Sequence, residues 1–247
     1  MKILLTNDDG IEAKGINVLF KVLSEKHIVY LIAPDSERSA CSNAITIRRD
    51  MNLKKKDDHR FSVSGFPADC INLGLNGDII PEVDIVVSGI NHGPNLGDDI
   101  FFSGTVAGAR TAYIFGKTGI SVSIDSYHKP SDYFIDASNF VLEFIESIQH
   151  DILENPMLFN LNYPDLDKSK VKGIKYTSIG KRIYNDKFEK SYDNPDHVVL
   201  KTHGTIGQIV IPGSDVTELK KGYISITPLN LDCTDYTYLK KKANQNG

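Results

Sequence analysis

The chain has 247 residues, of which 40% are hydrophobic and 24% charged, a composition typical of one large α/β domain or two small ones. Its formal net charge of -4 argues against general nucleic-acid binding, because such surfaces carry clustered excess Lys and Arg. Three widely spaced cysteines outside any C-x-x-C arrangement indicate neither a disulfide framework nor a zinc site. With no signal-peptide hydrophobic region and no stretch of ~20 apolar residues, we expect a cytoplasmic protein that does not associate with membranes.

The first 34 residues predict a strand, a loop, a helix and a second strand. The strands are "KILLT" (2–6) and "HIVYLIAP" (27–34). Between them Ile16, Leu19 and Leu23 fall at i, i+3 and i+7, the apolar stripe of an amphipathic helix. This spacing is typical of a right-handed βαβ unit in a parallel sheet.

The same alternation continues to about residue 155. We expect strands over 83–89 and 118–124, and helices over 67–75, 105–115 and around 141–148. The strands are continuously apolar, which indicates that helices cover both faces of the sheet. The expected fold class is therefore α/β, with a Rossmann-like, mostly parallel sheet flanked by helices.

After residue 155 the pattern changes to alternating apolar and polar residues. A protruding hairpin is predicted at about 181–203, with turn signals in "ND" (185–186) and "DNPD" (193–196). A hairpin alone is marginally stable in water, so we expect it to lie on the domain or on a second subunit. "GYISITPL" (222–229) is a late strand, and "KKKANQNG" (240–247) is expected to be a polar tail.

Two adjacent aspartates, Asp8 and Asp9, follow the first strand. Successive side chains of a strand point to opposite faces, so the two carboxylates converge only if the chain leaves extended geometry there. Asn7 and Gly10 are turn-forming residues that permit this. The carboxyl ends of parallel strands are where ligands bind in open α/β sheets. A polar turn with a helix cap is an equally good interpretation of this motif alone.

Two further polar loops leave the same edge of the predicted sheet. They are "APDSERSACSNAIT" (33–46) and "INHGPNLGDDIFFSGTVAGAR" (90–110). In the second, Ser103, Gly104 and Thr105 begin a helix, where free N–H groups and the helix dipole favour an anion such as phosphate. An ordinary Ser N-cap is the alternative. Neither a Walker loop nor a G-x-G-x-x-G follows the first strand.

In order and spacing, "TNDDG", "APDSERSACSNAIT", "GFPADC", "VSGINHGPNLGDDIFFSGTVAGA" and "GYISITPL" resemble the SurE (survival protein E) family of metal-dependent nucleotide phosphatases. The resemblance is strong over about residues 1–125 and weaker towards the C-terminus. It implies a single SurE-like phosphatase domain over 1–247. It also implies release of phosphate from nucleoside 5'- and 3'-monophosphates, with short polyphosphate as a further possible substrate.

The resemblance also implies a site. One divalent cation per subunit, Mn²⁺ or Mg²⁺, is expected on Asp8, Asp9, Ser39 and Asn91, and the catalytic residues are expected to be Asp8, Asp9 and Asn91. Carboxylate, hydroxyl and amide oxygens suit these hard cations. The expected reaction is metal-assisted hydrolysis of a phosphate monoester, with Ser103, Gly104 and Thr105 binding the phosphate.

Alternatives remain open at this point. An aspartyl nucleophile would replace the metal-activated water. A nucleotide- or metal-sensing module without turnover would use the same loops. His92, beside Asn91, is a candidate general acid, although an exposed loop histidine is the commoner reading. The resemblance finally implies a homodimer or homotetramer assembled through the 181–203 hairpin and the C-terminal segment.

Overall fold

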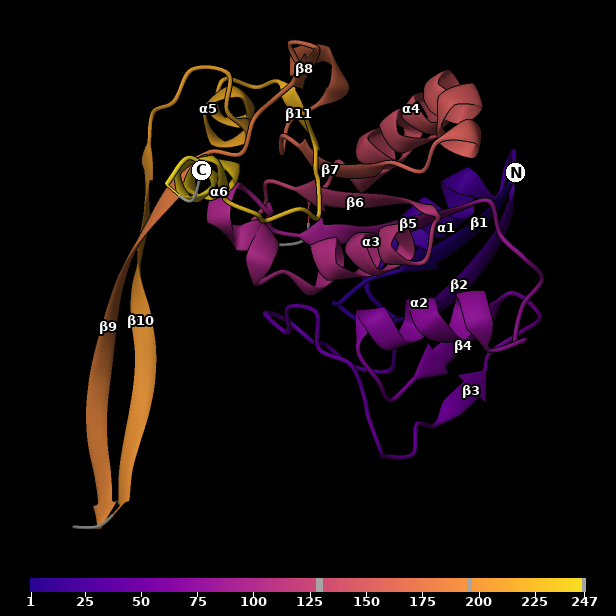
Figure 1. The fold of residues 1–247 in the computed structure, drawn as a ribbon. Helices are drawn as coiled ribbons and strands as arrows, with labels where there is room; N and C mark the ends of the chain where they lie inside the picture. The colour runs from indigo at the N-terminus through magenta and orange to yellow at the C-terminus, as the bar shows by residue number, and fades with distance from the viewer. Residues whose placement is uncertain (128–130, 195–196, 246–247) are drawn as a thin grey trace.

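The computed structural model describes residues 1–127, 131–194 and 197–245, which form a mixed sheet, helices on both of its faces and a separate long hairpin (Figure 1). The sheet strands are β1 (Lys2–Thr6), β2 (Ile28–Pro34), β3 (Leu53–Lys55), β4 (Arg60–Val63), β5 (Ile85–His92), β6 (Thr118–Ile124), β7 (Leu158–Tyr163), β8 (Ile174–Tyr176) and β11 (Ile224–Pro228). The hairpin consists of β9 (Lys181–Asn194) and β10 (His197–Ile209). The helices are α1 (Lys14–Leu23), α2 (Pro67–Asn76), α3 (Gly104–Ile114), α4 (Phe134–Glu154), α5 (Asp215–Lys220) and α6 (Tyr236–Ala243), with 3-10 turns η1 (Gly97–Phe101) and η2 (Lys168–Lys170).

Among the described residues the sheet has the strand order β3-β4-β2-β1-β5-β6-β7-β11-β8. The six strands from β4 to β7 pair in parallel, whereas β3 and β11 run antiparallel to β4 and β7. The mostly parallel sheet predicted from the sequence is confirmed. From β1 the chain adds β2 on one side and later β5 on the other, so the strand order reverses at β1. Ligands of open α/β sheets bind beyond the carboxyl ends of the strands at such a reversal.

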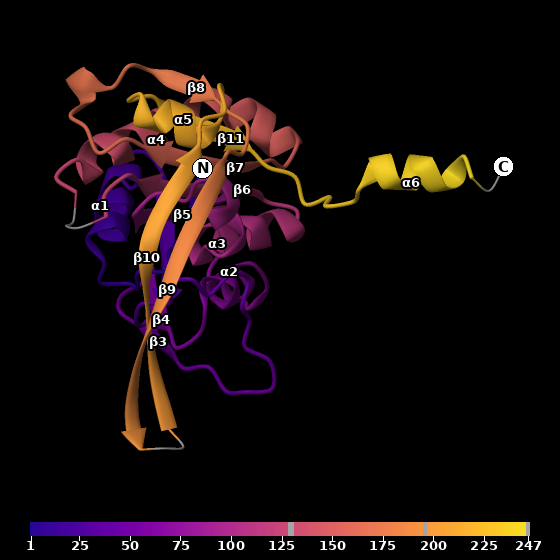
Figure 2. The same cartoon turned by 90° about the vertical axis from the view of Figure 1, so that its left-hand side faces the viewer.

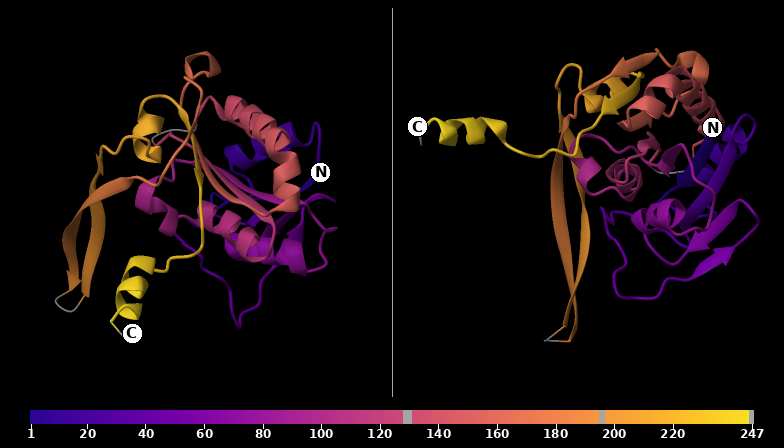
Figure 3. Two further views of the ribbon diagram at one scale, coloured as in Figure 1. Left: turned by 45° about the horizontal axis from the view of Figure 1, so that its top comes forward. Right: turned by 45° about the vertical axis from the view of Figure 1, so that its right-hand side comes forward.

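Helices cover both faces of this sheet, as the continuously apolar strands predict. The turned views show α1 and α4 against one face and α2 and α3 against the other (Figure 3). The larger core packs Ile16 and Leu19 of α1 and Val141 and Ile145 of α4 against the strands. The smaller core lies on the opposite face and includes Ile71 of α2. These two cores fix the carboxyl ends of the strands, where the polar loops begin.

The hairpin and α6 both extend away from the helices and the sheet (Figure 2). The hairpin is longer than predicted, since β10 ends at Ile209. It contacts η1 through β9 and projects away from the domain rather than lying on it (Figure 1). The "ND" turn signal was wrong. Asn185 and Asp186 lie within β9, opposite Thr205 and Gly204, because the strand pairing overrides the local turn preference. Residues 195–196 of "DNPD" lie outside the described residues.

Two lysine-rich segments form regular structure, and one of them lies within the predicted polar tail. Lys54 and Lys55 belong to the exposed edge strand β3, where lysine discourages pairing with another chain. Lys240–Lys242 form the last turn of α6, where positive charge interacts favourably with the helix dipole. Residues 246–247 lie outside the description. In the described part of the chain, no helix combines the length and apolar character needed to cross a bilayer.

Candidate active site

The chain turns sharply where β1 ends, and this turn brings the two aspartates together. The Asn7 side-chain amide donates a hydrogen bond to the Gly10 carbonyl over 2.9 Å, and Gly10 has a φ of +95°, a conformation that favours glycine. Asp8 is 4% exposed, whereas Asp9 is half-buried. The turn predicted from Asn7 and Gly10 is present, and both carboxylates face one cavity.

The loop after β2 lies beside this turn. The Arg38 backbone N–H donates to the Asp8 carbonyl over 2.7 Å, which fixes the loop against the aspartates. The Ser39 hydroxyl donates to a Glu37 carboxylate oxygen over 2.6 Å. The lone pairs of the Ser39 oxygen remain available to a cation, and Glu37 adds a third carboxylate to the cavity wall.

The end of β5 forms the third side of the site. The Asn91 side-chain nitrogen donates to the Gly93 carbonyl over 2.6 Å, which leaves the amide oxygen as the group available to a ligand. The His92 backbone N–H donates to Asp9 over 3.2 Å. The turn after β1, the loop after β2 and the end of β5 therefore bring Asp9, Ser39 and Asn91 to one place.

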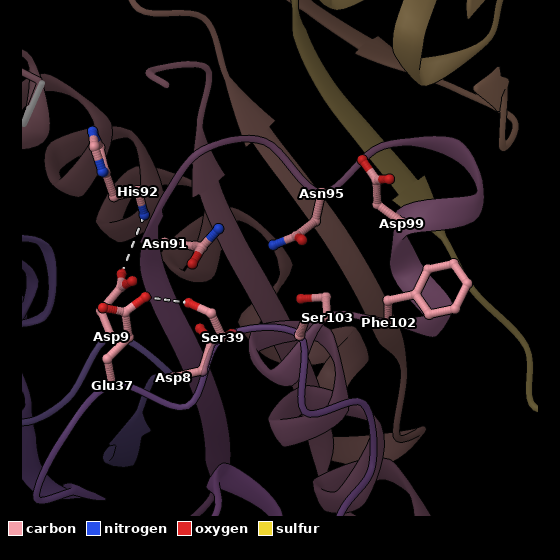
Figure 4. A pocket seen from close by; sticks show the side chains of 11 residues that line it. Asp8, Asp9, Glu37, Ser39, Asn91, His92, Asn95, Asp99, Phe102 and Ser103 are labelled. Atoms are coloured by element: carbon pink, nitrogen blue, oxygen red, sulfur yellow. Dashed lines mark hydrogen bonds between the residues drawn. The ribbon is translucent and has the colours of Figure 1, made fainter. Parts of the chain in front are cut away.

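These groups line one cavity of about 340 Å³, at the lower end of the usual range for small-molecule sites (Figure 4). Figure 4 shows Asp8, Asp9, Glu37 and Ser39 at one end and Asp99 and Phe102 at the other. The cavity is lined by Asp8, Asp9, Glu37, Ser39, Ala40, Asn91, His92, Asn95, Asp99, Phe102 and Ser103.

Helix α3 begins at this cavity. Ser103 is its N-cap and accepts a hydrogen bond from the Val106 N–H over 3.0 Å. Gly104 approaches Asp8 so closely that a Cβ at this position would lie 2.9 Å from the Asp8 side chain. Thr105 is fully buried, and its hydroxyl donates to Asp8. Ser103 therefore lines the cavity, while Thr105 contacts an aspartate behind it.

The electrostatics of the aspartates favour binding of a cation. Burial, together with the charge of Asp9, raises the pKa of the Asp8 carboxyl to about 6, although the Thr105 hydrogen bond opposes this shift. Burial also raises the pKa of Asp9, against the hydrogen bond from His92. Over residues 1–127, 131–194 and 197–245, no Lys or Arg side chain forms an ion pair with either carboxylate. A divalent cation would supply the charge that both groups lack.

The oxygen donors around the aspartates fit a hard cation. No group of three or more His, Cys, Asp or Glu side chains with metal-binding geometry occurs within the described ranges. The predicted ligands are instead two carboxylates with the Ser39 hydroxyl and the Asn91 amide oxygen, all of which line the cavity. The Asn7 side-chain oxygen, one residue before Asp8, is buried and has no hydrogen-bond partner among the described residues. Such an all-oxygen set suits Mg²⁺ or Mn²⁺ better than zinc.

Asn95 is a cavity residue that the sequence analysis missed. Its backbone N–H donates to the Asn162 side chain over 2.9 Å, and its carbonyl accepts from Asn160 and Asn162 over 2.8 and 3.0 Å. Its side-chain nitrogen donates to Ser123 over 2.8 Å. Polar residues alternating in the otherwise apolar strands β6 and β7 were the available signal, because buried strand positions rarely hold Asn and Ser without a partner.

Comparison with known proteins identifies the family. Residues 3–186 match the family model described as survival protein SurE. The chain belongs to the SurE family. It is 36% identical over 245 residues to the 5'-nucleotidase SurE of Clostridium botulinum (strain 657 / Type Ba4), covering 98% of this chain and 97% of that protein. It is 40% identical over 245 residues to the 5'-nucleotidase SurE of Leptospira interrogans (strain Fiocruz L1-130), covering 99% and 97%.

A solved SurE structure has the same fold. The crystal structure of the SurE protein from Aquifex aeolicus superposes with a TM-score of 0.85 at 32% identity, and each chain is covered completely. The resemblance to SurE proteins proposed from the sequence motifs is thus confirmed over nearly the whole chain. Of the residues that this resemblance implied, Asp8, Asp9, Ser39, Asn91 and Ser103 line the cavity, whereas Gly104 and Thr105 lie behind Asp8.

Proposed function

We propose that this SurE protein is a phosphatase that hydrolyses nucleoside 5'-monophosphates, and also 3'-monophosphates, with the help of one bound divalent cation per subunit. The observation that carries the proposal is that buried Asp8 and half-buried Asp9 face an oxygen-lined cavity and have no Lys or Arg ion-pair partner among the described side chains. The names of the full-length relatives support the same reaction.

Asp8, Asp9, Ser39 and Asn91 would hold the cation. When bound, it would neutralise phosphoryl oxygens and lower the pKa of a water molecule. Thr105 orients the Asp8 carboxylate through its hydroxyl, and the Asn91 amide is oriented by Gly93. These contacts orient two of the four proposed metal-binding side chains before the cation binds.

The α3 N-terminus binds the phosphate in this proposal. Ser103 presents its hydroxyl to the cavity, and the first turn of an α-helix favours an anion through its free N–H groups and the helix dipole. Asn95, held by the β6 and β7 side chains, faces the same space. Asp9 is the better candidate for a general base, because Asp8 is more deeply buried and already accepts the Thr105 hydrogen bond.

Phosphate release from a panel of nucleoside 5'- and 3'-monophosphates tests the proposal. Each is assayed in EDTA and then with Mn²⁺ or Mg²⁺ added in excess. We expect no release in EDTA and restored release with metal, and an Asp9→Asn variant inactive under both conditions. Full activity in EDTA contradicts the metal assignment. Nucleotide binding without phosphate release under every condition supports a sensing module instead.

We also propose that the chain assembles as a homodimer or homotetramer through its hairpin. Cross-strand pairing places the even-numbered residues on one hairpin face. That face exposes apolar side chains at fractions between 39% and 65%, namely those of Tyr184, Phe188, Tyr192, Val198, Leu200 and Ile206. A two-stranded ribbon with such a face needs a partner in water, and a second hairpin of the same kind supplies one.

The cytoplasm is the compartment that we propose for this chain. Cys41, Cys70 and Cys233 are free thiols, the state that a reducing compartment maintains. Fractionation of cells that produce the protein tests this directly, and recovery with secreted proteins contradicts it.

A further inference from the structure

At the end of the cavity opposite the proposed metal ligands, the polar side chain is that of Asp99. Asp99 lies there on η1, with its side chain 19% exposed, and the Phe102 ring beside it is 58% exposed (Figure 4). A substrate whose phosphate lies at Ser103 would direct the rest of its structure towards these two side chains. The end of the cavity at Asp99 is therefore placed to recognise what carries the phosphate.

Two side chains of the hairpin hold the Asp99 carboxylate. Arg182 forms an ion pair with one carboxylate oxygen, and the Tyr184 hydroxyl donates to the other. The Arg182 side chain is only 9% exposed, and its second terminal nitrogen donates to the Tyr127 hydroxyl over 2.8 Å. The orientation of this carboxylate thus depends on β9, about 85 residues away in the sequence.

A separate contact holds the backbone of η1. The Asp215 carboxylate is fully buried and accepts hydrogen bonds from the Gly97 N–H over 2.8 Å and the Gly180 N–H over 2.7 Å. Asp215 therefore joins η1 to the root of the hairpin independently of Arg182 and Tyr184. Removing one of those two side chains loosens the hold on the Asp99 carboxylate, while the η1 backbone stays attached through Asp215.

The ion pair between Arg182 and Asp99 also reduces the negative charge of the cavity. Asp8, Asp9, Glu37 and Asp99 all line the cavity, and an uncompensated carboxylate near a phosphate dianion repels it. Arg182 compensates the charge of Asp99. A carboxylate has about four lone-pair positions, so Asp99 can still accept hydrogen bonds from hydroxyl groups of a ligand.

We propose that Asp99 recognises the sugar hydroxyls of the nucleotide, and that Arg182 and Tyr184 are positioning residues through which the hairpin contributes to substrate selection. This inference rests on the proposed phosphatase function. It gives the hairpin root a role at the site in addition to any role in assembly.

The test compares three substrates: a nucleoside 5'-monophosphate, ribose 5-phosphate and phenyl phosphate, which has no sugar. Tyr184→Phe removes one hydrogen bond and should raise KM about three- to tenfold for both sugar phosphates. It should leave kcat and all constants for phenyl phosphate unchanged. Arg182→Met should raise the same two KM values more than Tyr184→Phe does, and Arg182→Lys should restore part of the loss because it keeps the charge.

Tyr192→Phe is the matched control, since Tyr192 lies on the same hairpin face but is 65% exposed and eight residues further along β9 than Tyr184, which contacts Asp99. Equal losses on all three substrates, or no loss with any variant, overturn the inference. A loss confined to the nucleotide overturns it too, because the base would then be the recognised group. Wild-type protein that hydrolyses none of the three contradicts the proposed function itself, an outcome distinct from the others.

Discussion

Replacing Asp8 by Asn tests how much the burial of this carboxylate destabilises the metal-free protein. Burial raises its pKa from 3.8 to about 6, so between these values the native state holds a proton that the unfolded chain releases. The free energy of unfolding of the metal-free protein should therefore fall as pH rises from about 4 to about 6. At about 1.36 kcal/mol per pKa unit, the shift is worth about 3 kcal/mol. Asn resembles the neutral acid and keeps the oxygen that accepts the Thr105 hydrogen bond.

The assay is urea unfolding of wild type and Asp8→Asn in EDTA at several pH values from 4 to 7.5. The stability of the variant relative to wild type should rise with pH by up to about 3 kcal/mol and level off above pH 6. Mn²⁺ at about 1,000 times its Kd should reverse this order, because a ligand at that concentration stabilises the protein that binds it by about 4.1 kcal/mol. A difference that stays constant with pH, or moves in favour of wild type, refutes the reasoning.

Three other substitutions give further tests. The Thr105 hydroxyl contacts Asp8 rather than the cavity, so Thr105→Ala should lower kcat/KM about tenfold. Added Mn²⁺ should partly restore the activity of this variant, as it should for Asn91→Ala. A loss that does not change with Mn²⁺ concentration would indicate that Thr105 binds the phosphate instead. Phe188→Ser, at a side chain 60% exposed on the hairpin, should lower the mass measured by light scattering, and an unchanged mass would exclude this face from assembly. Gly97→Ala should lower the urea midpoint more than Gly116→Ala. Both residues have positive φ, but of the two only Gly97 would bring a Cβ against a neighbour, the Gly180 carbonyl oxygen at 3.0 Å. Equal shifts of the urea midpoint for the two variants would show that the close approach of Gly97 to Gly180 does not affect stability.

The central part of the fold was predictable because local pattern and tertiary packing agree there. The stripe of Ile16, Leu19 and Leu23 forms the buried face of α1, and "TGISVSI" forms β6 with the predicted bounds. Disagreement begins where strands are short or exposed. β3 has three residues, all exposed, so it has no apolar alternation to detect. Asn185 and Asp186 suggest a turn locally, but pairing with β10 decides their conformation.

The site was predictable as a set of loops but not as a set of contacts. Asp8, Ser39 and Asn91 follow predicted strands, and strand order brings them together. The role of Thr105 could not be read from the sequence, because it depends on how α3, which packs against β5 and β6, brings its first turn up to Asp8. Asp99 lies in a glycine-rich loop whose partners come from β9, and no local pattern connects residues so far apart.

The hydrogen bonds around Asn95 restrict the motion of this part of the cavity wall. Its backbone and side chain are held by four hydrogen bonds from or to side chains of β6 and β7, and all three partner residues, Ser123, Asn160 and Asn162, are fully buried. A loop residue held in this way opens only when the sheet beneath it opens, so its amide proton should exchange with solvent as slowly as those of the central strands. That wall of the cavity is then already ordered before a substrate arrives, and little conformational entropy remains for it to lose on binding.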